Sequence, residues 1–187
     1  MRKPSGRKKI IISIFILIIV GAPAFAAYLL LPGKQSNSES EAAISAMEQV
    51  IPYFGAENTI SGLGRDPLAV MSINGVDIVG GLEIPSINLR APVAESGTEK
   101  EFFATRESGS PVKGNLVIIG GRHDVFSRIT RGKPGEKVMF TDVDGIRYEY
   151  RITTQFHKKD WDEADYDLML CYRTDKNTMF VLACTKE

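Results

Sequence analysis

Short β-branched segments separated by turn residues dominate the chain from Met71 onward, and this pattern restricts the possible folds more than any other feature. Runs of this kind, bounded by Gly, Pro, Asn and Asp, are typical of β-strands. Many short strands in succession favour a closed barrel or a sandwich, here with one or two helices. The expected strands cover residues 81–84, 116–119, 137–141, 146–153, 168–171 and 179–184.

The clearest local prediction is a hairpin that joins residues 137–141 to residues 146–153. Residues 142–145, Asp-Val-Asp-Gly, lie between these strands, and Asp-Gly tolerates the positive φ angles that a tight hairpin turn needs. After the turn, apolar and charged residues alternate, which directs every second side chain into the core. The core-facing residues would be Ile146, Tyr148, Tyr150 and Ile152.

Composition excludes several classes of protein and of site. Basic and acidic residues both number 23, and five of the bases lie in residues 1–9, so the rest of the chain has 18 bases, 23 acids and a net charge of −5. This acidic body lacks the basic surface of a nucleic-acid-binding protein. With two His and two Cys, zinc ribbons and dense disulfide frameworks are excluded. Residues 142–145 resemble half of a calcium loop whose other ligands are missing, so we expect neither metal nor cofactor.

The N-terminal segment predicts a membrane anchor. Residues 1–9 are basic, and the 22 residues from Ile10 to Leu31 carry no charge. At 1.5 Å per residue, such a helix spans a hydrocarbon core of about 30 Å. Because basic flanks stay in the cytoplasm, we expect a cytoplasmic tail (1–9), a single-pass anchor (10–31) in the cell membrane and an extracellular C-terminal domain. A cleaved signal peptide ending at Ala24-Phe25-Ala26 is the alternative, which would leave an apolar N-terminus.

The anchor is followed by a linker that contains a short helix, over residues 32–70. Residues 33–41 are rich in Gly, Ser, Asn and Glu, and residues 54–70 have loop composition. Between them, residues 41–53 have apolar positions at helical spacing, and Pro52 would end the helix. The expected buried face comprises Ile44, Met47, Val50 and Ile51. The β domain would then occupy residues 71–187.

Four segments of this domain resemble the sortases, the Gram-positive transpeptidases of surface proteins, which usually follow a transmembrane anchor. Residues 74–93, NGVDIVGGLEIPSINLRAPV, are similar to the sortase entry segment, and three further motifs follow in the family's order. The resemblance covers most of residues 72–184 and implies a sortase-like closed β-barrel. The further motifs are GNLVIIG (114–120), KPGEKVMFTDVDGIRYEY (133–150) and DYDLML (165–170).

The resemblance also implies a catalytic pattern. In the family, a Cys thiolate forms a thioester with the sorting peptide, a His protonates the leaving amine, and an Arg supports the oxyanion or holds the peptide. In the ungapped alignment, the His position is occupied by Gly121, the Cys position by Arg173, and the Arg position by Met179 or Thr178. All three positions are therefore substituted, which predicts a protein without transpeptidase activity.

A second alignment remains open, in which residues 180–184, FVLAC, match the family's cysteine strand. Cys184 would then be the nucleophile, and His123 would lie 61 residues earlier. This alignment would leave the barrel without the strand that carries the arginine, exposing an unpaired edge. It also leaves the match at residues 165–170 unexplained, so we favour the substituted alignment.

Other residues have simpler interpretations. We expect Cys171 to be a buried small apolar residue on the face of Arg173, to pair with Phe180 across a turn at residues 174–177, and not to form a disulfide. His157 should be a solvated loop residue, and Trp161 a packing residue in the loop above the peptide groove. Exposed arginines such as Arg122 and Arg128 could bind a peptide carboxylate.

The favoured hypothesis is a membrane-anchored sortase-like protein that binds sorting-signal peptides, pilins or a partner sortase without turnover. The first alternative is an active cysteine transpeptidase that uses Cys184 and His123. The second is a β-barrel binding module unrelated to protein sorting.

Overall fold

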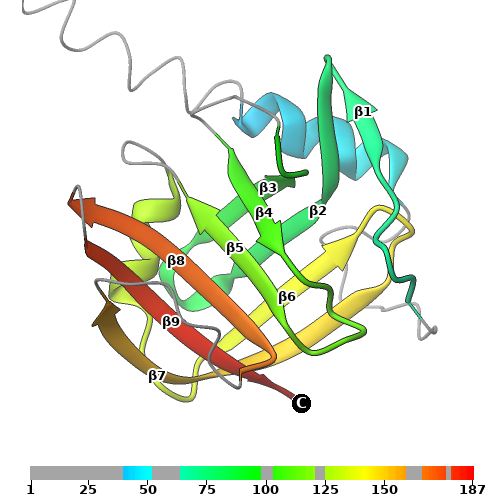
Figure 1. Ribbon diagram of the computed structural model, residues 1–187. Helices are drawn as coiled ribbons and strands as arrows, with labels where there is room; N and C mark the ends of the chain where they lie inside the picture. The colour runs from blue at the N-terminus through cyan, green and yellow to red at the C-terminus, as the bar shows by residue number, and fades with distance from the viewer. Residues whose placement is uncertain (1–39, 52–63, 98–102, 121–124, 159–165, 176–177) are drawn as a thin grey trace, which may run out of the picture. The chain divides into compact units, whose positions relative to one another are not determined.

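The computed structural model describes residues 40–51, 64–97, 103–120, 125–158, 166–175 and 178–187 (Figure 1). The chain divides into two units, residues 1–35 and 36–187. The expected anchor at residues 10–31 lies outside the described residues. Among the helices that are described, none has the length and apolar character needed to cross a bilayer.

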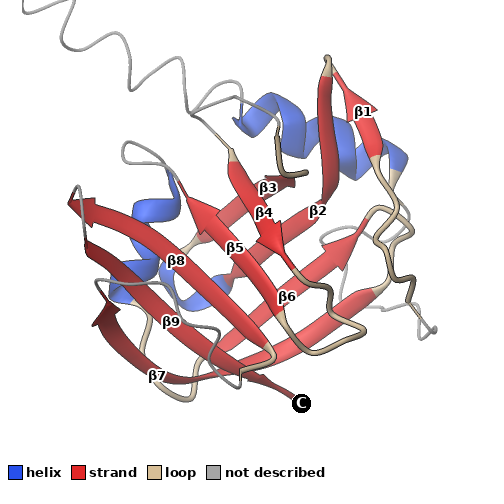
Figure 2. Ribbon diagram, in the orientation of Figure 1, coloured by secondary structure: helices blue, strands red, loops and turns tan. Residues whose placement is uncertain are grey.

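Nine strands in the described part of the chain form one sheet in the order β1-β2-β3-β4-β5-β8-β9-β7-β6. An additional β2–β6 pairing closes strands β2 to β9 into an eight-stranded barrel, with β1 outside the closed ring. The mostly β, closed-barrel prediction is therefore confirmed (Figure 2). The strands are β1 (Met71–Ile73), β2 (Val76–Ile84), β3 (Leu89–Ala94), β4 (Ala104–Ser108), β5 (Leu116–Gly120), β6 (Lys137–Asp142), β7 (Arg147–Lys158), β8 (Leu168–Asp175) and β9 (Thr178–Lys186).

The sequence-based prediction missed some strands and made others too short. β1, β3 and β4 were not expected from the residue pattern, and β2, β7 and β8 are longer than predicted. Because β7 continues to Lys158, His157 lies in a strand rather than in a loop, although its side chain is exposed as expected. The predicted turn at residues 174–177 is also too long, since β8 ends at Asp175 and β9 begins at Thr178.

The barrel interior is filled by apolar side chains from every strand of the closed ring. Tyr150, Phe140 and Leu82 are fully buried there, and Tyr148 and Ile152 are buried beside them, as the alternation in β7 predicted. The 3₁₀ helix η2 (Val125–Arg131) follows β5 and adds Phe126 and Ile129, both fully buried, to the same core. The single-turn η1 (Pro85–Ile87) joins β2 to β3.

The β6–β7 hairpin turns at the predicted residues. Gly145 has a φ of 84°, which an L side chain rarely adopts. The Asp142 carboxylate accepts hydrogen bonds from the backbone N–H groups of Asp144 (3.0 Å) and Ile146 (2.9 Å) and from the Tyr148 hydroxyl (3.2 Å). Burial raises the pKa of Asp142. One carboxylate oxygen of Asp142, Oδ1, holds the turn, and the other, Oδ2, accepts from the Tyr148 hydroxyl on β7.

A helix covers residues 40–50 and packs outside the barrel against β1, β2 and β3. Ile44 and Met47, with Ile51 just after the helix, are buried against a second apolar cluster that includes Val76 and Ile78. The expected contribution of Val50 is wrong, because its side chain is 57% exposed. At about 100° per residue, a face centred on residues 44, 47 and 51 turns position 50 toward solvent.

Candidate functional site

The strands β5, β8 and β9 meet at one end of the barrel, where two of the three positions singled out by the resemblance, Arg173 and Met179, lie. β5 and β8 are parallel, with Gly120 opposite Tyr172, so their carboxyl ends lie together. β8 and β9 are antiparallel, with Arg173 opposite Met179, so the amino end of β9 lies at the same place (Figure 1). The chain continues from Gly120 into residues 121–124, which lie outside the described residues and include Gly121, Arg122 and His123. We call this end of the three strands the site end.

Two of the described residues at the site end carry no group suited to acyl transfer. Arg173 is exposed and Met179 is half-buried. A guanidinium stays protonated, and a thioether carries no proton to transfer, so neither side chain supplies a thiolate nucleophile or a general acid for a leaving amine. No carboxylate among the described residues forms an ion pair with Arg173, which leaves its donors available.

The outer face of β5, β8 and β9 carries an apolar cluster beside Arg173. Side chains of β8 alternate between faces: Leu168 and Leu170 point into the barrel core, whereas Met169 and Cys171 belong to the outer cluster. Arg173 continues the outer set, so it shares the face of Cys171, as predicted. The buried members of this outer cluster are Val117, Met169, Cys171 and Val181, and Ile119, Phe156, Tyr166 and Met179 pack against them.

The two cysteines are free and lie on opposite faces of the sheet. Cys171 is fully buried in the outer cluster, and Cys184 is fully buried in the barrel core. The partner of Cys171 on β9 is Val181, not Phe180 as expected. β8 extends past the predicted strand end to Asp175, which lies opposite Thr178, and an irregularity between Arg173 and Asp175 then changes the pairing by one residue, which leaves Cys171 opposite Val181.

Cys184 occupies the end of β9 that is remote from the site end. Cys184 lies opposite Leu168 of β8. It is five residues beyond Met179 along β9, which corresponds to about 17 Å of extended chain. Burial raises the pKa of the Cys184 thiol to about 12. At neutral pH this thiol is protonated and enclosed by apolar side chains. Its separation from His123 involves residues outside the described part of the chain.

The remaining candidate residues have separate locations. His157 lies on β7, and its ring makes an edge-on contact with the Phe180 ring at 5.4 Å between centroids. Arg128, on η2, donates a hydrogen bond from Nη1 to the Asn88 carbonyl at 2.6 Å. Trp161 lies outside the described residues. No group of three or more His, Cys, Asp or Glu residues in the described segments is arranged to hold a metal ion.

Comparison with known proteins agrees with the strand arrangement at the site end. The family model for the sortase domain matches residues 82–187, which is more than half of the chain. The chain belongs to the sortase family. Its sequence is 26% identical to sortase A of Bacillus anthracis over 146 residues, covering 73% of this chain and 68% of that relative.

Solved sortases share the fold at low sequence identity. A Clostridium perfringens sortase D5 transpeptidase superposes with a TM-score of 0.52 and 19% identity, covering 63% of this chain and 82% of that one. Sortase A from Corynebacterium diphtheriae gives a TM-score of 0.51 and 14% identity, covering 89% and 95%. The family predicted from the four motifs is therefore confirmed, and so is its barrel.

Proposed function

We propose that this protein is a membrane-anchored, extracytoplasmic sortase homologue that binds sorting-signal peptides, pilins or a partner sortase without cleaving them. The observation that supports the proposal is the Arg173–Met179 pair at the site end, at the positions where the favoured sequence alignment predicts the family's nucleophilic Cys and catalytic Arg. The third position, Gly121, follows the last residue of β5 in the sequence.

The chemistry of the cysteines supports the absence of turnover. Thioester formation needs a thiolate, and thiolates form in electropositive, partly exposed surroundings. The chain has two cysteines, and both are fully buried. The raised pKa of Cys184 disfavours its thiolate further, and its position at the remote end of β9 separates it from Arg173 and Met179.

Two features support peptide binding: the closed barrel and an exposed arginine beside the outer apolar cluster. The closed barrel is complete without the catalytic side chains, because its stability comes from the interior core. The exposed guanidinium of Arg173 lies on the same face as the outer apolar cluster, next to half-buried Met179. A cation beside an apolar surface suits an extended peptide that carries a carboxylate.

A turnover assay on the full-length protein in detergent micelles tests the proposal. We expect no cleavage of fluorescent L-P-x-T-G-like peptides and no thioester adduct by mass spectrometry, while the same peptides bind saturably in fluorescence anisotropy. Cys171→Ala and Cys184→Ala serve as matched controls. Transpeptidation that disappears only in Cys184→Ala would establish the active alternative, and the absence of any binding would establish an unrelated module.

The predicted orientation has its own test. An alkaline-phosphatase fusion after Lys34 should be enzymatically active, because this reporter requires export. Activity only from a cytoplasmic reporter at the same position would contradict the proposed topology.

A further inference from the structure

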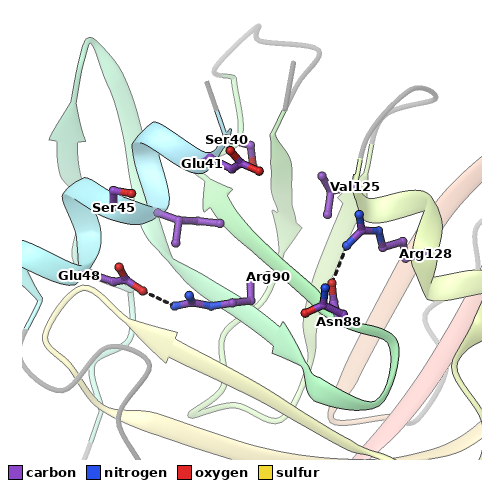
Figure 3. Close-up of a pocket in the computed structure, with 9 residues that line it drawn as sticks. Ser40, Glu41, Ser45, Glu48, Asn88, Arg90, Val125 and Arg128 are labelled. Atoms are coloured by element: carbon purple, nitrogen blue, oxygen red, sulfur yellow. Dashed lines mark hydrogen bonds and ion pairs between the residues drawn. The ribbon is translucent and has the colours of Figure 1, made fainter. Parts of the chain in front are cut away.

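A cavity of about 380 Å³ lies between the helix at residues 40–50 and the 3₁₀ helix η2 (Figure 3). Ser40 and Glu41 line it from the helix side and Arg128 from the η2 side, while Asn88 and Arg90 contribute from the start of β3. Its size falls within the range of small-molecule sites. The cavity is polar and carries charges of both signs.

One pair of charges in the cavity is internally neutralised. Arg90 donates from Nη2 to Glu48 at 2.7 Å and from Nε to Glu83 at 2.8 Å. The guanidinium is therefore shared between two carboxylates, which fixes its position and leaves little charge to attract a ligand. Glu48 and Arg90 thus form part of the wall rather than the recognition groups.

The other two charged side chains lack ionic partners. Arg128 uses Nη1 for the Asn88 carbonyl, and no described carboxylate forms an ion pair with it. A guanidinium has five N–H donors, so the remaining N–H groups are free for a ligand. Glu41 is exposed, and within the described segments it forms neither a hydrogen bond nor an ion pair.

Ser40 adds a hydroxyl group to the cavity lining from the start of the helix. A hydroxyl both donates and accepts hydrogen bonds, so it suits a polar ligand that carries either charge.

Both walls are fixed before any ligand binds. η2 is anchored by the fully buried side chains of Phe126 and Ile129, and the helix by Met47, which is fully buried. Asn88 holds the carbonyl that orients Arg128, and it sits in the left-handed region with a φ of 50°. A preorganised site loses less conformational entropy on binding.

We propose that this cavity binds a small zwitterion, namely a free amino acid or a short peptide, with its carboxylate at Arg128 and its ammonium at Glu41. A simple anion would be repelled by Glu41, and a simple cation would leave Arg128 unpaired. A ligand that carries both charges satisfies both side chains, and its ammonium or carboxylate also reaches the Ser40 hydroxyl. This proposal does not rest on the peptide binding proposed for the site end.

Titration calorimetry on the full-length protein in micelles tests the proposal with alanine, Ala-Ala and Ala-Ala-Ala. We expect saturable binding of at least one of these lengths. For that length, the N-acetylated and C-amidated forms should each bind about tenfold more weakly or worse, because each lacks one charge-assisted interaction. No saturable binding at any length, or equal binding of the blocked forms, would overturn the proposal.

Charge-removing variants assign each end of the ligand. Arg128→Gln should remove the preference for the free carboxylate over the amide, and Glu41→Gln should remove the preference for the free amine over the acetylated form. Arg131→Gln is the matched control, because Arg131 is an exposed cation of the same 3₁₀ helix that does not line the cavity. Because Glu41 is exposed, its variant should fold even if Arg128→Gln is unstable. Unchanged selectivity in Glu41→Gln would contradict the assignment.

Discussion

The two ends of the β5–β8–β9 segment differ in what holds each residue in place. At the remote end, Leu116, Leu168 and Cys184 are fully buried in the barrel core. At the site end, Arg173 is exposed and Met179 is half-buried. Packing constrains the first set, because any change of volume there disturbs many neighbours. At Arg173 and Met179, only a catalytic or binding role would restrict which residue is tolerated.

This difference means that a sortase barrel would persist if its catalytic positions are substituted as we propose. The interior core does not include Arg173 or Met179, so replacing the family's residues there leaves the folding energy nearly unchanged. Fold and activity are carried by separate sets of residues. The predictions below test this separation.

Restoring chemistry at the site end should give the largest effect. We expect the triple change Gly121→His, Arg173→Cys and Met179→Arg to produce thiol-dependent peptide hydrolysis where the natural protein has none. Single restorations should give nothing, because catalytic residues act as a unit, and loss of one oxyanion donor alone typically costs about 10²–10³ in rate. Hydrolysis is measured with a fluorescent peptide before and after iodoacetamide treatment. A triple variant with Arg173→Ala in place of Arg173→Cys is the control, and equal activity in both would refute a thiol mechanism.

Thiol reactivity should differ between the two ends by orders of magnitude. Because burial raises the pKa of Cys184 from 9.0 to about 12, its thiolate population at pH 8 falls by about 10³, apart from any steric protection. A cysteine introduced by Arg173→Cys, on an exposed position, should be alkylated rapidly. Mass spectrometry after timed iodoacetamide labelling measures both rates. Labelling of Cys184 as fast as that of the introduced cysteine would mean that the remote end opens readily.

Alanine substitutions along β9 should lower the free energy of unfolding more at the buried positions than at the site end. Leu182→Ala, at a fully buried position opposite Leu170, should lower the free energy of unfolding by about 2–5 kcal/mol. Met179→Ala, on the same strand at the half-buried site end, should cost about 1 kcal/mol. Urea denaturation followed by circular dichroism gives both values. Equal losses would show that the site end contributes to the core after all.

The smallest expected effect distinguishes a paired charge in the barrel wall from the unpaired charge at the site end. Burial alone would raise the pKa of Glu95, but hydrogen bonds from Arg106 (2.9 Å from Nε) and Ser96 outweigh it and lower that pKa. The stabilisation is therefore present above the ordinary pKa of about 4.5 and is lost as the pH falls through the lower folded value. Glu95→Gln should cost about 0.5–1 kcal/mol at pH 7 and nothing at the acid end.

Arg173→Gln is the matched comparison for this pH dependence. Since no described carboxylate pairs with Arg173, its removal should change stability by less than about 0.5 kcal/mol at every pH. Thermal or urea melts across the acidic range measure both variants. A pH-dependent loss in Arg173→Gln would reveal an acidic partner at the site end.

Strong local signals allowed the sequence to predict the β6–β7 hairpin, the helix near residues 41–51 and the strand pair β8–β9. β3 was missed because Pro92 and Arg90 weaken its strand pattern, and β4 because its residues, ATRES, are mostly polar. These strands form because the barrel pairs them, with β3 between β2 and β4. These two strands depend on pairing with other strands of the barrel, which a local residue pattern does not reveal.

The site was only partly predictable for a similar reason. Family resemblance predicts roles for Arg173 and Met179, which lie opposite each other, but the predicted partner of Cys171 was wrong by one residue, because neither the extension of β8 to Asp175 nor the ladder irregularity there has a sequence signal. Arg128 was noted as a carboxylate-binding candidate, yet its cavity exists only because the helix at residues 40–50 docks beside η2. No spacing rule links Glu41 to Arg128, which are 87 positions apart in the sequence.

The position of β9 has a consequence for how the protein is made. This strand, at residues 178–186, lies between β7 and β8 and pairs with both, so the edge that each of them presents to it has no partner until it is made. A ribosome synthesises residues 147–175 before residues 178–186. Until β9 is made, the backbone N–H and C=O groups along the facing edges of β7 and β8 have no strand partner. The barrel therefore cannot close before residues 178–186 have been made. A message truncated before residue 178 should yield an open, protease-sensitive chain that quality control removes.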